Sequence, residues 1–77
     1  MKIVPLSQLP SGSKGKIVSI NTGQGLARRL VQMGLVPGLE VEVVLNQGKG
    51  PILIKVRGTE LAVSRGVAMK IMVEVTI

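Results

Sequence analysis

Apolar and polar residues alternate along most of this chain, and a period of two is typical of β-strands with one buried face. The segments that show this period, or that are rich in β-branched residues, are 16–20, 39–45, 52–56, 61–63 and 71–77. A glycine-rich stretch, 47–50, separates the second segment from the third and predicts a hairpin turn. The pattern therefore predicts five short strands.

Two stretches near the N-terminus depart from this regularity. Residues 6–12 contain Pro10 and predict a short helical turn or loop. Within the strand at 16–20, Ile17 and Ile20 are three residues apart, so a regular strand would point them to opposite faces. A bulge between them would turn both toward the core.

One segment, 24–33, has the period of a helix. Leu26, Leu30 and Met33 fall at i, i+4 and i+7, which predicts one apolar face directed at the core. The polar side carries Arg28, Arg29 and Gln32. We expect this amphipathic helix to be inserted between the first strand and the second.

Both ends of the helix have candidate capping residues. Asn21 or Thr22 is expected to cap the start, because a side-chain oxygen there can accept a hydrogen bond from a free backbone N–H. Gly34 is expected to end the helix, since glycine adopts the left-handed conformation at low cost. Pro37 and Gly38 then predict a turn.

Five strands and one helix in 77 residues predict a mainly β fold, a small barrel of about five strands with one inserted helix. A chain of this length has room for one domain, which we expect to span residues 1–77. No segment has the roughly 18 consecutive apolar residues that a membrane helix needs. Nothing in the sequence directs the chain out of the cytoplasm, so a cytoplasmic location is expected.

Composition excludes several kinds of chemistry. The chain has no Cys, no His and no Phe, Tyr or Trp. It therefore lacks the thiol and imidazole groups that supply many nucleophiles, general bases and zinc ligands. Among the four acidic residues, Glu40 and Glu42 share a strand face and offer at most a weak metal site. We expect no enzyme activity, no cofactor and no metal site.

The net charge of +6, from ten Lys and Arg against four acidic residues, favours an anionic partner. A small basic barrel that binds nucleic acid is one alternative. The cations are scattered, however, and there is no aromatic side chain on which bases could stack. A protein-interaction module is therefore favoured, and nucleic acid is not expected as a partner.

The most specific motif is the run Arg29-Leu30-x-x-Met33-Gly34-Leu35-x-Pro37-Gly38. Around it lie Leu6, Leu9, Gly12, Gly15, Ile17 and Ile20 on one side, and Gly50-Pro51-Ile52, Gly58 and Leu61-Ala62-Val63-Ser64-Arg65 on the other. In these residues nearly the whole chain resembles the FeoA family, ferrous iron transport protein A. The resemblance implies an SH3-like β-barrel with a helix inserted between the first two main strands.

The resemblance also implies a role. It points to a cytosolic protein that supports or regulates ferrous iron uptake by binding the membrane transporter FeoB or its GTP-binding part. Such a protein would be peripheral to the membrane only through this partner.

The candidate contact residues for a partner are Arg28, Arg29, Gln32, Leu35 and Val36. Arginine forms bidentate contacts with carboxylates and is frequent at binding hot spots. Leu35 and Val36 lie in the loop after the helix, where they are expected either to form an exposed docking surface or to pack in the core. Gly34, Pro37 and Gly38 are expected to have structural roles in the helix cap and the turn.

An SH3-like barrel commonly binds proline-rich peptides in an aromatic-lined groove. This chain has no aromatic residue, so an aliphatic groove or pairing at a sheet edge would have to replace that mode. The high aliphatic content also leaves open a weak homo-oligomer.

Overall fold

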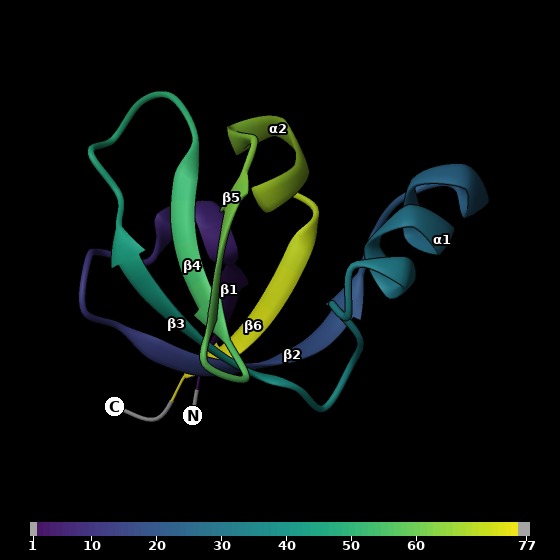
Figure 1. Cartoon of the computed structure of the whole chain (residues 1–77), viewed down its shortest axis with the longest axis horizontal. Coiled ribbons are helices and arrows are strands. Elements are labelled where there is room, and N and C mark those ends of the chain that lie inside the picture. The colour runs from purple at the N-terminus through teal and green to yellow at the C-terminus, as the bar shows by residue number, and fades with distance from the viewer. Residues whose placement is uncertain (1, 76–77) are drawn as a thin grey trace.

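The computed structural model describes residues 2–75, which form a mainly β fold built on one strongly bent sheet (Figure 1). Its elements are β1 (Lys2–Pro5), the 3₁₀ helix η1 (Leu6–Gln8), β2 (Lys14–Ile20), α1 (Gln24–Gln32), β3 (Glu40–Leu45), β4 (Ile52–Val56), β5 (Thr59–Val63), α2 (Arg65–Ala68) and β6 (Ile71–Val75). The predicted mainly β class with an inserted helix is confirmed. The predicted number of about five strands is corrected to six within the described range, because the sequence pattern does not predict β1.

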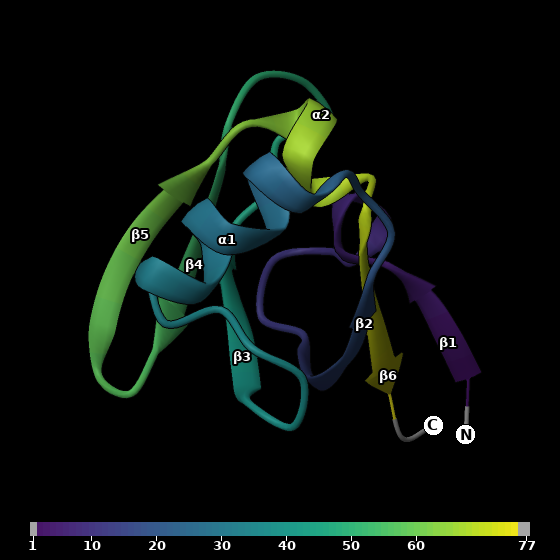
Figure 2. The same cartoon turned by 90° about the vertical axis from the view of Figure 1, so that its right-hand side faces the viewer.

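The strand order in the sheet is β1-β6-β2-β3-β4-β5, and all neighbouring strands are antiparallel. The last strand, β6, therefore lies between the first two (Figure 2). Lys2 pairs with Val75, so the two ends of the described chain are side by side. β1 is an edge strand that ends at Pro5, a position where proline is tolerated because no further strand needs its missing N–H.

The bulge expected in β2 is present. The register with β6 shifts between Ile17 and Ser19, which leaves Val18 as the extra residue. Ile17 is consequently buried, and Ile20 packs against the edge of the same core. A bulge also bends its strand, and the far end of β2 leads away from the sheet toward α1 (Figure 1).

The core within residues 2–75 is entirely aliphatic and contains no buried polar or charged residue. Its members are Leu6, Leu9, Ile17, Leu30, Leu35, Val41, Val43, Ile52, Ile54, Val56, Val63, Ala68, Ile71 and Val73. Half of them are alternate residues of β3, β4 and β6. The period of two in the sequence is thus the period that fills the core.

The outer face of the sheet carries all four glutamates, each paired in register with a lysine. The pairs are Lys14–Glu42, Lys16–Glu40, Lys16–Glu74, Lys55–Glu42 and Lys55–Glu60. Directly opposite residues share a face, and opposite charges there attract by about 0.2–1 kcal/mol. The acidic residues are therefore balanced on this face, and the excess positive charge of the protein lies elsewhere.

Candidate partner-binding site

Helix α1 stands to one side of the strands (Figure 1). Leu30 is buried and Leu26 packs against the edge of the core, as the helical period predicts. Met33 is 44% exposed, however, so its predicted place in the core is wrong. The N-terminal cap is Gly23, which forms no side-chain hydrogen bond, so neither of the two residues before it caps the helix. The barrel side of α1 thus rests mainly on one buried leucine.

Gly34 ends the helix with a φ of +87°, as predicted. Its N–H donates to the carbonyl of Val31 at 2.9 Å, and the N–H of Leu35 donates to the carbonyl of Leu30 at 2.8 Å. These two bonds form a Schellman motif, which turns the residue after the glycine back against the last turn of the helix. Leu35 is accordingly 0% exposed and belongs to the same buried cluster as Leu30. Of the two positions expected for Leu35, the core is the observed one, and its inclusion among the candidate contact residues is corrected.

The turn predicted at Pro37 and Gly38 is also present. Gly38 has a φ of +92°, and the N–H of Leu39 donates to the carbonyl of Val36 at 3.2 Å. The N–H of Gly38 in turn donates to the carbonyl of Ile17 at 2.7 Å, which ties the turn to β2. The loop after α1 is therefore fixed at both ends.

The polar candidates share the exposed side of α1. Arg28, Arg29 and Gln32 are all exposed, and Val36 in the following loop is half-buried. At about 100° of rotation per residue, Arg28 lies on the far side of the helix from Leu30, and Arg29 lies between the two sides. The structure therefore brings the three polar candidates together but gives the two arginines different surroundings.

Arg29 lies at the rim of a narrow groove between α1 and the junction of β5 with α2, elements that are seen together in Figure 2. We call it the α1 groove. Its volume is about 180 Å³. The lining residues are Leu26, Arg29, Leu30, Met33, Ala62, Val63, Ser64 and Val67. All but Arg29 and Ser64 are apolar, so the groove has the chemistry of a site for an aliphatic group.

Helix α2, which forms one wall of the groove, is held by a polar network that we call the Asn46 clasp. The Asn46 side chain donates through Nδ2 to the carbonyls of Ser7 at 3.0 Å and Leu9 at 2.7 Å. Its Oδ1 accepts from Nη2 of Arg65 at 2.7 Å and from the N–H of Gly48 at 3.0 Å. Because Arg65 is the first residue of α2, the clasp joins α2 to the N-terminal turn and to the loop after β3.

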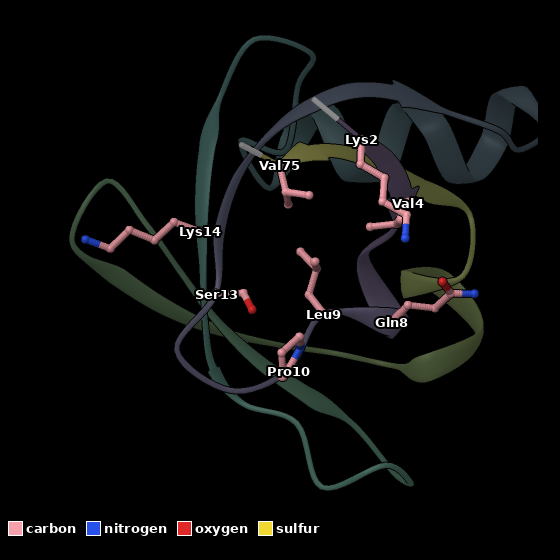
Figure 3. A pocket seen from close by; sticks show the side chains of 8 residues that line it. All are labelled: Lys2, Val4, Gln8, Leu9, Pro10, Ser13, Lys14 and Val75. Atoms are coloured by element: carbon pink, nitrogen blue, oxygen red, sulfur yellow. The ribbon is translucent and has the colours of Figure 1, made fainter. Parts of the chain in front are cut away.

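A second hollow, of about 370 Å³, lies where β1, β6 and the loop before β2 meet (Figure 3). Val4, Leu9 and Val75 point into it, whereas Lys14 extends away from it. A ligand site usually combines an apolar lining with several convergent polar groups. The polar groups at this hollow are spread around its margin, so we assign no function to it.

Within the described residues, no three side chains of His, Cys, Asp or Glu lie together as a metal site would require. Glu40 and Glu42 share the outer face of β3 and lie opposite Lys16 and Lys14. Zinc prefers nitrogen and sulfur ligands, and isolated carboxylates opposite lysines do not fit it. No helix of the described chain is long and apolar enough to cross a membrane.

The sequence pattern does not reveal the second wall of the groove. This wall includes α2, whose start is capped by Ser64: the N–H of Val67 donates to Oγ of Ser64 at 3.3 Å. No local spacing relates α2 to α1, which lies some thirty residues earlier. The two helices are brought together by the core, in which Leu30 and Val63 are both buried.

The strand order and the inserted helix define a small SH3-like β-domain as the class of this protein. The FeoA domain family matches residues 4–75, and the chain belongs to this family. A relative from Methanocaldococcus jannaschii, provisionally named Fe(2+) transport protein A, is 41% identical over 70 residues, which are 91% of this chain and 84% of the relative.

Two solved structures show the same relationship. The crystal structure of an iron uptake regulatory protein, FeoA, matches with a TM-score of 0.90 and 40% identity over 95% of this chain and 97% of that one. FeoA from Stenotrophomonas maltophilia, solved with zinc, matches with a TM-score of 0.77 and 31% identity over 90% of this chain and 87% of that one. That protein is described as an SH3 domain protein and suggested as an activating factor for ferrous iron transport. The predicted family and SH3-like fold are therefore confirmed.

Proposed function

We propose that this chain is a non-catalytic cytosolic module that supports ferrous iron uptake by binding the cytosolic GTP-binding part of a FeoB-type transporter. Membership of the FeoA domain family and the similarity to Fe(2+) transport protein A support the link to ferrous iron transport. A sequence without Cys or His supports a role in binding rather than in catalysis. Iron is then the cargo of the partner and not a ligand of this chain.

The observation that carries the proposal is the construction of α1. The helix stands to one side of the strands, with Arg28, Arg29 and Gln32 exposed and with an aliphatic groove along the side that carries Leu30, where Arg29 lies at the rim. Arginine can form two parallel hydrogen bonds with a carboxylate, and exposed apolar surface beside it supplies the area that a stable complex must bury. Val36, half-buried in the loop after the helix, is the remaining candidate contact.

The test is calorimetric titration of the full chain into the purified cytosolic part of the transporter, without nucleotide, with GDP and with a non-hydrolysable GTP analogue. We expect binding in at least one nucleotide state. Reversing both arginines, Arg28→Glu with Arg29→Glu, should weaken it by about tenfold or more, because charge reversal at an interface replaces attraction by repulsion.

A matched control is a second double variant with the same net charge as the double arginine variant. Lys2→Glu with Lys49→Glu reverses two exposed cations outside α1 and should leave the affinity within about twofold if the contact is local. An equal loss in both double variants would show that only net charge matters and would contradict docking through α1. No binding of the folded chain in any nucleotide state would contradict the proposed function itself.

A further inference from the structure

We propose that the α1 groove receives an aliphatic side chain from an acidic segment of the partner protein, with a carboxylate of that segment on Arg29. The proposal rests on the proposed function for the identity of the partner. It concerns residues that the sequence motifs do not single out as contacts, namely Leu26, Met33, Ala62 and Val67.

The size of the groove sets the size of its occupant. Cavities for small-molecule ligands typically measure about 300–1,000 Å³, and the α1 groove measures about 180 Å³. An apolar cavity of about 150 Å³ holds a group as large as benzene. The groove therefore accommodates one or two side chains of a neighbouring protein rather than a free metabolite.

The lining determines the chemistry of the anchor. Leu30 and Val63 are buried at the base, and Leu26 and Val67 are half-buried. Met33 contributes an exposed, unbranched side chain that can adjust to different shapes. Because this chain has no aromatic residue, it lacks the surface on which a proline-rich peptide would stack. An aliphatic anchor such as leucine matches this lining.

The distribution of charge determines the sign of the segment. Residues 21–39 and 61–73, which contain every residue of the groove, include no Asp or Glu. The nearest carboxylate along the chain belongs to Glu60, and this residue pairs in register with Lys55. Arg29 at the rim is therefore available to a carboxylate of the partner. A charge-assisted hydrogen bond beside an apolar anchor is a common arrangement at binding hot spots.

The first test substitutes two residues whose side chains are almost equally exposed. Met33 is 44% exposed and lines the groove, whereas Leu45 is 45% exposed and does not. With the transporter's cytosolic part as the probe, Met33→Gln should weaken binding by about tenfold, because an amide pressed against an aliphatic anchor would lose its hydrogen bonds to water without gaining a partner. Leu45→Gln should stay within about twofold. Equal affinities of the two variants would overturn the groove proposal, even where the wild-type chain binds.

The role of Arg29 is tested by comparing its substitution with the same substitution at Arg28. Arg29→Gln removes the charge at the groove and keeps a polar side chain of similar reach, so it should weaken binding more than Arg28→Gln does. The loss in Arg29→Gln should also shrink as salt is raised, since a rim charge is screened. A larger loss in Arg28→Gln would place the carboxylate on the outer side of α1 and contradict the assignment.

A second probe separates this proposal from the proposed function. It is a synthetic peptide of about 20 residues, long enough to form a helix in water, built from Leu, Ala and Glu, with a control in which Gln replaces every Glu. In methyl-labelled protein, the acidic peptide should shift the resonances of Leu26, Met33 and Val67, and the Gln peptide should shift them less. Peptide binding without transporter binding would support the groove and contradict the FeoB partner. Shifts confined to other methyl groups, or equal shifts with both peptides, would overturn the groove proposal.

Discussion

Replacing Asn46 by Ala tests how α2 is held in place. The substitution removes the amide that donates to the carbonyls of Ser7 and Leu9 and accepts from Arg65 and Gly48. The bonds to the first three of these residues are partly buried, so water replaces them poorly. The bond to Gly48 is exposed, and water can replace it at little cost.

The expected loss follows from these contacts. A partly buried hydrogen bond contributes about 1 kcal/mol net, and one to a charged group contributes more, so the three bonds together predict a loss of about 3 kcal/mol in the free energy of unfolding. In a domain of this size each kcal/mol lowers Tm by roughly 4–8 °C. Asn46→Ala should therefore melt at least about 12 °C below the wild-type chain.

Thermal and urea unfolding, followed by circular dichroism, measure this loss. Gln47→Ala is the control, because its exposed side chain makes no bond in the clasp and its removal should change the free energy by less than about 0.5 kcal/mol. Asn46→Asp separates the two halves of the clasp. It keeps the acceptor for Arg65 but replaces the donor with a second oxygen that faces the carbonyls of Ser7 and Leu9. A loss below about 1 kcal/mol in Asn46→Ala would refute the view that the clasp stabilises the fold.

Substituting three glycines by alanine should change the free energy of unfolding in the same assay by different amounts. Gly15→Ala should cost about 3 kcal/mol or prevent folding, because its Cβ would lie 2.8 Å from the backbone oxygen of Glu74 and overlap the Val73 side chain. Gly34→Ala should cost about 1–2 kcal/mol, since its φ of +87° strains any side chain although space is free. Gly25→Ala, inside α1 with nothing within 4 Å, should instead stabilise the chain by about 0.5 kcal/mol. A destabilised Gly25→Ala, or a neutral Gly15→Ala, would contradict the backbone geometry assigned to α1 or β2.

Local patterns predict most of this fold because most of its core is arranged by local rules. The period of two in β3, β4 and β6 places alternate residues inside, and the spacing of Ile17 and Ile20 predicts the bulge in β2. The sequence pattern does not predict β1, because this strand has only four residues and ends at Pro5. It is a strand only because β6 pairs with it, and no local pattern contains that pairing.

Only the part of the candidate site that α1 contributes can be predicted from the sequence. The exposed positions of Arg28, Arg29 and Gln32 follow from the helical period. The sequence leaves two positions open for Leu35, and the Schellman motif after Gly34 selects the core because it turns this residue back against the helix. Ala62 and Val67 reach the groove through tertiary packing alone. Exposed and half-buried aliphatic residues distant in sequence give no local signal of their proximity.

Stability and docking are linked through α2, because the Asn46 clasp and the α1 groove share this helix. Val43→Ala removes part of a fully buried side chain in β3 and should cost about 2–3 kcal/mol, close to the cost of Asn46→Ala. At a temperature where both variants are folded, Asn46→Ala should bind the partner more weakly, since it frees the wall that carries Val67. Val43→Ala should keep the wild-type affinity. Equal affinities would mean that α2 holds its position without the clasp, and the groove would then be formed by the aliphatic core alone.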